Sequence, residues 1–202
     1  LEEDEAGEVS RNAAHAVVSE AQENNVVAIG PGLRVGHGQA EILRILIRAE
    51  RRIVADADAL NNLAKMGDWT AILKARMVLT PHPGEMKRLW KGVFRDEMPS
   101  GRVEQAEALA RRCGAVVVLK GAGTVVCDGR RYYINQTGNP GMASGGTGDV
   151  LTGIIAALLG QGMDEFEGAV LGVYVHGLAG DLAAEKIGEV SLTAKDVIDH
   201  LG

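Results

Sequence analysis

The sequence predicts an α/β fold built on a mostly parallel sheet with an antiparallel hairpin at one edge. Between residues 26 and 119, short apolar runs alternate with segments of helical periodicity. This alternation is expected when parallel strands are joined by right-handed helical crossovers. The apolar runs are almost uninterrupted, which is typical of strands buried on both faces. Later in the chain, Asp128 and Gly129 join two short strands and form a strong hairpin signal.

The first half of the chain supplies three of the expected strands. Ser10 is placed to cap a helix over 11–24, and the apolar run at 26–29 is the first strand. The elements that follow are a helix over 39–50, a strand over 52–55, a helix over 58–66, a strand over 77–79 and a helix that ends near Trp90.

The second half completes the sheet and ends in three helices. A helix over 102–113 leads into a fourth buried strand over 115–119. The elements that follow are the hairpin strands over 124–127 and 131–135 and helices near 147–160, 165–187 and 193–200.

Every unusual segment of the sequence follows a predicted strand. In parallel sheets, ligands bind outside the carboxyl ends of the strands. One shared cleft is therefore expected to collect the segments 30–38, 56–58, 80–85, 120–124 and 136–149.

Length and composition indicate a single domain over 1–202. The 202 residues suffice for one substantial core, and apolar residues make up 46% of them. The chain opens on Leu1 without an initiator Met and enters a helical pattern where α/β domains usually begin with a strand. This start predicts a fragment or a processed piece.

Charge and cysteine usage restrict the function classes. The net charge is −6, and basic residues form nothing longer than pairs such as Arg51-Arg52, which argues against nucleic-acid binding. Cys113 and Cys127 lie in or beside apolar runs and are expected to be buried, reduced thiols of a cytoplasmic protein. No apolar run reaches membrane-spanning length, so no membrane partner is expected.

The segment 138–149 is the most informative for function. Glycines at 145, 146 and 148 leave backbone N–H groups open to a ligand, and an apolar helix starts near Thr147. A helix start offers unpaired N–H groups and a positive dipole end, which suit a phosphate. Asp149 adds a potential general base beside this anion site. Phosphoryl transfer from a nucleotide to a hydroxyl group requires this combination.

The common nucleotide motifs are absent. No Gly-x4-Gly-Lys-Ser/Thr string occurs, and a dinucleotide fingerprint fails because Leu151 and Val126 stand where glycine is required. A glycine-rich turn can also be purely structural. Its position between a hairpin and an apolar helix favours the functional interpretation.

A family resemblance narrows the chemistry. Ser144-Gly-Gly-Thr-Gly-Asp-Val-Leu-Thr-Gly153 resembles the anion-hole and catalytic-aspartate signature of ribokinase-like enzymes. The segments that accompany it in order are Gly30-Pro-Gly-Leu33, Asp56-Ala-Asp-Ala-Leu60, Thr80-Pro-His-Pro-Gly-Glu85, Lys120-Gly-Ala-Gly-Thr124 and Gly138-Asn-Pro-Gly-Met-Ala-Ser-Gly-Gly-Thr-Gly-Asp149. Together they resemble the ADP/ATP-dependent NAD(P)H-hydrate dehydratase family over about residues 10–201.

The resemblance implies a ribokinase-like three-layer sandwich and a role for each motif. Asp149 would be the base that activates the hydroxyl of the hydrated nicotinamide ring. The residues implied to bind the nucleotide are Lys120, Gly121, Ala122, Gly123, Thr124, Gly145, Gly146, Thr147 and Gly148. Those implied to bind the substrate are Gly32, Arg34, His82, Pro83, Gly84, Glu85, Asn139 and Asp149. ADP or ATP would be the co-substrate with Mg²⁺ as its companion ion, and members of the family assemble as homo-oligomers.

The chain departs from the family pattern in two places. A first strand and a glycine-rich segment that normally precede this region are missing, and Arg34 stands where the family usually has glycine. The Arg34 side chain either contacts a cofactor phosphate or points to solvent.

Several residues allow more than one interpretation. His82 sits between prolines, which favours ligand contact over a structural role, and Glu85 either caps the following helix or helps to organise a metal. On an extended strand Asp56 and Asp58 would face the same side, but if Asp58 caps the next helix only Asp56 faces the cleft. A structural role is favoured for this pair. His176 lies in a Gly/Ala-rich helix and is expected to be a packing residue.

Two rival functions share the glycine–aspartate loop. One is a small-molecule kinase of the same fold, for example one that phosphorylates a thiamin-precursor alcohol. The other is a non-catalytic nucleotide-binding protein that kept the pocket and lost turnover. The sequence leaves open the choice between ADP and ATP and between NADH and NADPH hydrates.

Overall fold

A six-stranded sheet organises the computed structural model, which describes residues 9–202. The strands are β1 (Val26–Ile29), β2 (Arg52–Ala55), β3 (Arg76–Leu79), β4 (Val116–Leu119), β5 (Val125–Cys127) and β6 (Tyr132–Ile134). They lie side by side in chain order; β1 to β4 are parallel, and β5 and β6 add antiparallel pairs at one edge. This confirms the mostly parallel sheet with an edge hairpin. The start of the chain, residues 1–8, lies outside the described residues.

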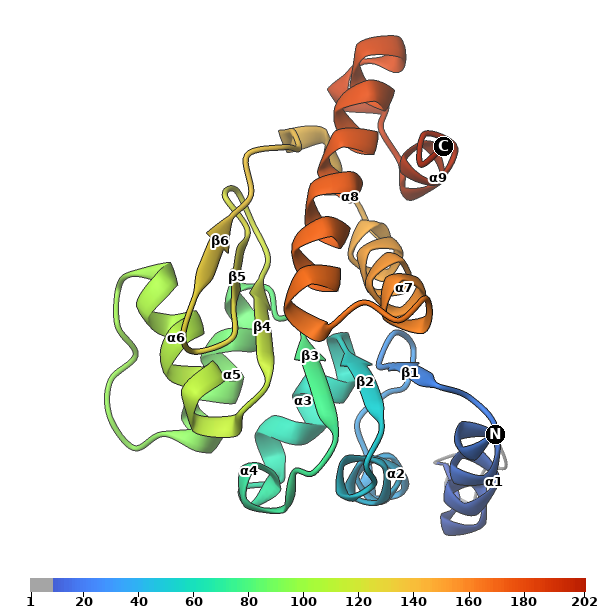
Figure 1. The fold of residues 1–202 in the computed structure, drawn as a ribbon, viewed down its shortest axis with the longest axis vertical. Coiled ribbons are helices and arrows are strands. Elements are labelled where there is room, and N and C mark those ends of the chain that lie inside the picture. The colour runs from blue at the N-terminus through green and yellow to red at the C-terminus, as the bar shows by residue number, and fades with distance from the viewer. Residues whose placement is uncertain (1–8) are drawn as a thin grey trace.

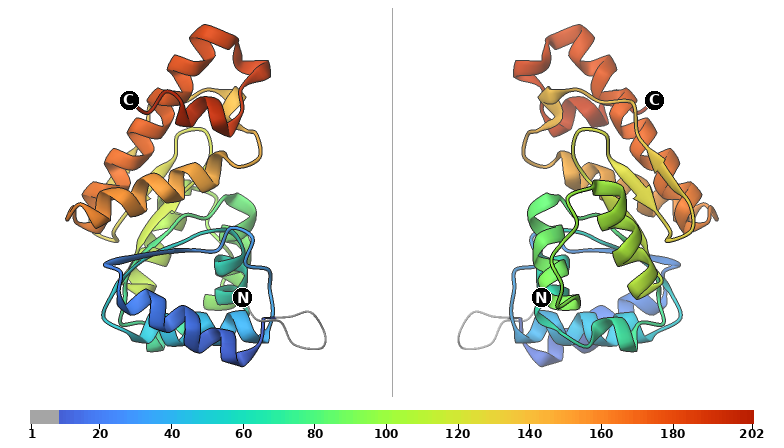
Figure 2. Two further views of the ribbon diagram at one scale, coloured as in Figure 1. Left: turned by 90° about the vertical axis from the view of Figure 1, so that its right-hand side faces the viewer. Right: turned by 90° about the vertical axis from the view of Figure 1, so that its left-hand side faces the viewer.

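Helices cover both faces of the sheet and create three layers (Figures 1 and 2). One outer layer contains α1 (Arg11–Gln22), α2 (His37–Arg48), α3 (Ala57–Lys65), α4 (Trp69–Ile72), α5 (Pro83–Val93) and α6 (Arg102–Cys113). The other contains α7 (Thr147–Gly160) and α8 (Glu165–Ile187), with α9 (Ala194–Ile198) and the short turns η1 (Pro140–Met142) and η2 (Glu189–Ser191) near the end of α8.

The protein has two apolar cores, one on each face of the sheet, because side chains along each strand point alternately to the two faces. Ile53 and Met77 point into the core shared with α1 to α6, whereas Val54 and Val78 point into the core shared with α7 and α8. Successive side chains of a strand face opposite sides, so a continuous apolar run is needed to fill both layers. This is why strands of four residues appear in the sequence as unbroken apolar runs.

The predicted bounds agree closely with the structure. The strands at 26–29 and 52–55 and the helices at 102–113, 147–160 and 165–187 have the predicted limits. The prediction missed α4, because a single turn is too short to show helical periodicity. Trp69, fully buried in the first core, anchors that turn.

The carboxyl ends of the strands meet at one edge. Backbone hydrogen bonds continue the ladder beyond the strands: Asp56 N–H donates to Ile29 O (3.1 Å), Thr80 N–H to Ala55 O (3.1 Å) and Lys120 N–H to Pro81 O (2.8 Å). The unusual segments that follow β1, β2, β3 and β4 therefore lie next to one another, as predicted.

No membrane-crossing element is found in this part of the chain. Among residues 9–202, no helix has both the length and the apolar character that crossing a bilayer requires.

Gly30 permits the close contact between the first two strand ends. Its φ is 134°, and a Cβ at this position would collide with the carbonyl oxygen of Asp56. Gly162 also has positive φ, at 101°, but no atom lies within 4 Å of the position its Cβ would take. A comparison of alanine substitutions at Gly30 and Gly162 therefore distinguishes the cost of backbone strain from the cost of steric collision.

We expect Gly30→Ala to destabilise the protein more than Gly162→Ala. Both substitutions place a side chain at positive φ, which costs about 1–2 kcal/mol. Only Gly30→Ala adds a collision, for which overpacking costs about 1–3 kcal/mol more. The free energies of unfolding from urea titrations measure the difference, and equal losses for the two variants would contradict this account.

Candidate active site

A cavity of about 620 Å³ opens beside the carboxyl end of β4, between the loop that follows β6 and helices α7 and α8. Seven predicted nucleotide-binding residues line it: Lys120, Gly121, Ala122, Gly123, Thr124, Thr147 and Gly148. Gly145 and Gly146, which were predicted with them, are exposed and lie outside the lining. The turn after β4 and the first turn of α7 thus line the same cavity.

The cavity has further lining residues that the sequence analysis either placed in the shared cleft without a role, as in the segment 136–149, or did not place there at all. They come from the segment after β6 and from the two long helices: Asn135, Gln136, Thr137, Gly138, Pro140, Met142, Ala143, Leu151, Val173, His176 and Gly177. The sequence held a signal that α8 and the segment after β6 approach each other closely. Glycine is unfavourable inside a helix and usually has a packing reason there, so Gly177 indicates a close neighbour. A Cβ at Gly177 would collide with the hydroxyl oxygen of Thr137.

Asn139 lines the cavity, but its side chain already holds the loop in place. Its Oδ1 accepts from Gly141 N–H at 3.1 Å, and its Nδ2 donates to Asp181 Oδ1 at 2.9 Å. Gly138 N–H donates to the other oxygen of Asp181 at 2.8 Å. Asp181 of α8 therefore fixes the segment that forms this wall of the cavity.

The first turn of α7 has the open backbone that the predicted anion site requires. Gly146 precedes the helix with φ of 89°, and the Thr147 hydroxyl lies 2.8 Å from Met142 O and 2.9 Å from Ser144 O. The Thr147 side chain is thereby tied to the preceding loop. The first N–H groups of the helix have no intrahelical acceptor, so they remain available to an anion.

Asp149 follows directly in this turn. Its side chain is exposed, and no group among residues 9–202 forms a hydrogen bond or ion pair with its carboxylate. Gly148, its neighbour, lines the cavity, whereas Asp149 does not. The carboxylate therefore stands next to the nucleotide cavity on the solvent side, free to accept a proton from a bound molecule.

Asp56 is the buried centre of the site. Only 1% of its surface is exposed, Lys120 Nζ lies 2.6 Å from its Oδ1, and the Thr152 hydroxyl donates to its Oδ2 at 3.0 Å. Three elements, β2, β4 and α7, are joined through this one carboxylate. A Cβ at Gly148 would lie 3.2 Å from Lys120 Nζ, so any other residue at position 148 would crowd the ammonium.

The interpretation of Asp56 and Asp58 needs a correction. Asp56, not Asp58, precedes α3 as its N-cap residue, with its side chain committed to Lys120 and Thr152, and Asp58 lies in the first helical turn. The two carboxylates do not face the same side because the strand ends before Asp56. The favoured structural role of the pair agrees with these contacts.

His82 and Glu85 form a capping box at the start of α5. His82 Nδ1 accepts from Gly84 N–H at 3.0 Å, and Glu85 Oε2 accepts from His82 N–H at 2.8 Å. The imidazole remains half-exposed with its Nε2 3.3 Å from Glu85 Oε1, and Pro83 begins the helix. Glu85 thus caps the start of α5, which is one of the two roles considered for it.

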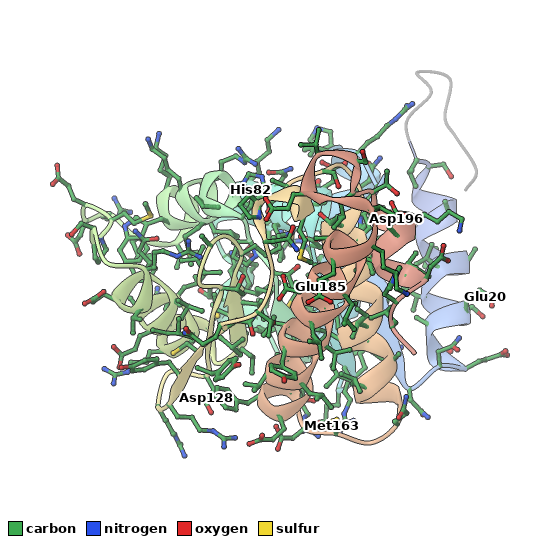
Figure 3. The ribbon with its side chains drawn as sticks, turned by 90° about the horizontal axis from the view of Figure 1, so that it is seen from above. Glu20, His82, Asp128, Met163, Glu185 and Asp196 are labelled. Carbon is green, nitrogen blue, oxygen red and sulfur yellow. The ribbon has the colours of Figure 1, made fainter. Side chains whose placement is uncertain are left out.

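None of the residues from His82 to Glu85 lines the nucleotide cavity. Figure 3 shows His82 on the side of the molecule opposite Asp128 and Met163. Asp128 follows β5 and Met163 follows α7, both near the amino ends of the parallel strands. His82 therefore lies at the carboxyl ends of the parallel strands but outside the lining of the cavity.

The loop after β1 is anchored to α3 with a strained backbone. Arg34 has φ of 64°, its N–H donates to Asp58 Oδ2 at 2.9 Å, and its carbonyl accepts from Asn62 Nδ2 at 2.9 Å. Among the described residues, Ala57 is the other non-glycine residue with positive φ. The exposed Arg34 guanidinium bonds to no described residue. Gly32 lies in the same loop with φ of 69° and open space around it.

His176 is more than the packing residue that the sequence predicted. It lines the cavity, and its Nε2 lies 2.9 Å from the carbonyl oxygen of Thr147 at the start of α7. Burial lowers the pKa of His176, the Lys120 ammonium lowers it further, and the bond to Thr147 opposes these effects. The ring is therefore held in its neutral form near pH 7.

Comparison with known proteins identifies the family. The family model described as NAD(P)H-hydrate dehydratase matches residues 2–201. The chain belongs to the NAD(P)H-hydrate dehydratase family. A bifunctional NAD(P)H-hydrate repair enzyme of Thermofilum pendens is 43% identical over 204 residues, which cover 100% of this chain and 38% of that protein. The chain thus spans well under half the length of this relative.

Solved structures give the same fold. An ADP/ATP-dependent NAD(P)H-hydrate dehydratase from Bacillus subtilis, co-crystallised with ATP/Mg²⁺ and soaked with CoA, matches with a TM-score of 0.74 and 31% identity, over 88% of this chain and 64% of that one. A hydroxyethylthiazole kinase from Pyrococcus horikoshii matches with a TM-score of 0.73 but 18% identity, over 96% and 76% of the two chains. The second match shows a shared fold alone. Together with the three layers, these neighbours confirm the ribokinase-like architecture.

We expect Asp56→Ala to destabilise the protein by about 3–5 kcal/mol, because it leaves the Lys120 ammonium uncompensated in a buried setting. Asp58→Ala, which removes one acceptor at a more open position, should cost about 1 kcal/mol. Urea unfolding of both variants measures the contrast. Replacing Lys120 by Met in the Asp56→Ala background should recover part of the loss; no recovery, or equal losses for the two aspartates, would refute the assigned role.

Stability should decline as the pH falls below about 6.5, the ordinary histidine pKa. The folded-state pKa of His176 is lowered, so between the two pKa values the unfolded chain binds more protons and the free energy of unfolding rises with pH. His176→Gln should flatten this part of the profile. Unfolding free energies measured from about pH 5 to pH 7.5 give the comparison, and identical slopes would contradict the prediction.

Proposed function

We propose that this protein catalyses the ADP- or ATP-dependent dehydration of hydrated NADH and NADPH and so restores the nicotinamide cofactor. The observation that carries the proposal is the arrangement at the start of α7. An unpaired, exposed carboxylate at Asp149 adjoins Gly148, which forms part of the nucleotide cavity. A base on one side of a phosphate site and a nucleotide cavity on the other suit phosphoryl transfer to a hydroxyl.

The proposed reaction has two stages. Asp149 takes the proton of the ring hydroxyl while the hydroxyl oxygen attacks the terminal phosphorus of the nucleotide, and the bond from that phosphorus to the bridging oxygen breaks. Phosphate then leaves the ring with the electrons of its carbon–oxygen bond. The released phosphate takes a proton from the adjacent ring carbon, and the electrons of that carbon–hydrogen bond restore the double bond. The net products are the reduced cofactor, inorganic phosphate and the shortened nucleotide.

Backbone donors and one cation support the transferred phosphoryl group. The first N–H groups of α7 point at a bound anion, and removal of one such donor costs about 10²–10³ in rate in enzymes that use them. Lys120 lies in the same cavity with its position fixed by Asp56. This arrangement supports nucleotide binding by the Lys120–Thr124 turn and the Gly145–Gly148 segment.

Mg²⁺ fits this site as an ion carried by the nucleotide. Among residues 9–202, no group of three or more His, Cys, Asp or Glu side chains could hold a metal by itself. Mg²⁺ commonly binds through substrate phosphates, one or two carboxylates and water, so a protein cage is not required. When bound, the ion would neutralise charge on the phosphate oxygens.

The substrate is proposed to bind along the carboxyl ends of β1 and β3. Gly32 and Arg34 follow β1, and the residues that follow β3 are His82, Pro83, Gly84 and Glu85. The free guanidinium of Arg34 supports contact with a cofactor phosphate, and Asn139 would contribute from the cavity wall. A higher KM for the hydrate in Arg34→Ala, with the KM for nucleotide unchanged, would support this placement; an unchanged hydrate KM would reject it.

The activity is tested directly with hydrated NADH and either ADP or ATP. Recovery of the absorbance of reduced nicotinamide confirms the proposal. The rival kinase predicts no recovery, with phosphorylation of a hydroxymethylpyrimidine or thiazole alcohol instead. A non-catalytic nucleotide-binding protein predicts binding of ADP without either reaction.

We expect Asp149→Asn to lower the rate of cofactor recovery by about 10²–10⁴-fold, because the amide cannot accept the hydroxyl proton. The affinity for ADP, measured by calorimetry, should stay unchanged. Asp199→Asn is a matched control, since Asp199 is a half-exposed aspartate that pairs with Lys195 in α9, outside the cavity lining. Full activity in Asp149→Asn would rule out the assigned base.

We also propose that the chain is one ribokinase-like domain that assembles as a homo-oligomer in the cytoplasm. A stripe of apolar side chains along α8 supports assembly: Leu171, Tyr174, Leu178 and Leu182 are each about 40% exposed. Cys113 and Cys127 are buried free thiols, as a reducing compartment favours. Sedimentation analysis of Leu178→Glu tests the assembly, and an unchanged mass would reject the α8 stripe as its interface.

A further inference from the structure

His176 is fixed between α8 and the start of α7. Its Nε2 lies 2.9 Å from the carbonyl oxygen of Thr147. A carbonyl oxygen only accepts hydrogen bonds, so Nε2 must carry the proton in this contact. The neutral imidazole then has its lone pair on Nδ1.

The Nδ1 atom has no partner within the described part of the chain. His176 forms no further hydrogen bond or ion pair with any of residues 9–202. The imidazole is half-buried and lines the cavity together with Thr147 and Gly148. An acceptor that is partly withdrawn from water and borders a ligand cavity is placed to receive a donor from the ligand.

The surroundings keep this acceptor available. Lys120 is the charged group that acts on His176, and its positive charge together with burial disfavours the doubly protonated ring. A protonated ring would offer a donor in place of the acceptor. The contact is therefore suited to a neutral hydrogen-bond donor and not to a phosphate oxygen, which only accepts.

We infer that His176 accepts, through Nδ1, a hydrogen bond from the adenine nucleotide, and this inference rests on the proposed function. The donor is a ribose hydroxyl or the exocyclic amine of adenine, the two kinds of neutral donor that the nucleotide carries. The same ring holds the Thr147 carbonyl, so His176 connects nucleotide recognition with the helix start that binds the phosphate.

The two ring nitrogens can be separated by substitution. The side-chain amide of Gln reaches the position of Nε2, so His176→Gln keeps a donor for Thr147 and loses the acceptor at Nδ1. Asn reaches only the position of Nδ1, so His176→Asn keeps an acceptor for the ligand and loses the bond to Thr147. His200→Gln serves as a matched control, because His200 also contacts a backbone carbonyl, that of Asp196, but lies outside the cavity lining.

Calorimetric titration of the protein with ADP in EDTA tests the inference, since EDTA removes any metal-bound water that could supply the donor. We expect His176→Gln to weaken ADP binding by roughly 3- to 10-fold, the effect of one net hydrogen bond. ADP binding should be weakened less in His176→Asn, and His200→Gln should bind ADP like the wild type. Among 2′-deoxy-ADP, 3′-deoxy-ADP and inosine diphosphate, one analogue should bind the wild type and His176→Gln equally and thereby identify the donor.

Each other outcome overturns a defined part of the argument. Equal ADP affinity in the wild type and His176→Gln, or an equal loss for ADP and every analogue, would overturn the inference and leave the proposed function standing. Absence of binding of both ADP and ATP by the wild type, with Mg²⁺ as well as with EDTA, would overturn both. If the Gln variant fails to fold, the ¹⁵N resonance of His176 Nδ1 in the wild type decides, because accepting a bond from ADP must shift it and an unshifted signal refutes the contact.

Discussion

The contact of Asp56 with Lys120 and Thr152 is the constraint on which the site depends. A carboxylate that is 1% exposed is unfavourable unless it is paired, and here a cation from the end of β4 and a hydroxyl from α7 satisfy it. The charge therefore fixes α7 over the strand ends with its first turn beside Lys120. Leu151, Ile155 and Leu159 pack α7 on the sheet, and the polar network adds directional contacts that apolar packing lacks.

Small residues make this polar centre geometrically possible. Gly148 lets the Lys120 ammonium approach the α7 backbone, Gly30 lets the loop after β1 lie against Asp56, and Gly177 lets the segment around Thr137 approach α8. At Gly30 and Gly177 backbone or side-chain atoms occupy the space of a Cβ, and at Gly148 a Cβ would crowd the Lys120 ammonium. The site thus depends on segments that pack closely at these glycines, and the cavity is the space left between the end of β4, α7 and α8.

The sequence specified the elements better than the contacts between them. The segment Arg52–Ala55 predicted its strand with correct limits, because its apolar residues are buried on both faces of the sheet. The partner of Asp56 lies 64 positions away, and that of His176 lies 29 positions away. No local pattern encodes such pairs, which explains why Asp58 was considered as a helix cap and His176 as a packing residue. The place of the Lys120–Thr124 turn in the cavity lining was predictable because the turn follows a strand.

The position of Asp149 also bears on how one fold serves different reactions. Gly148 lines the cavity while Asp149 is exposed outside its lining, so under the proposed activity the nucleotide and the hydroxyl substrate approach one helix turn from different directions. A kinase and a dehydratase need the same arrangement for the transfer itself. Under the proposed activity, the phosphorylated hydrate then loses phosphate through the electrons of its own ring, and no second base has to be built beside α7. Selectivity must therefore reside in the segments after β1 and β3, where the strained Arg34 loop and the capped His82 turn present the groups that remain unused by the nucleotide cavity.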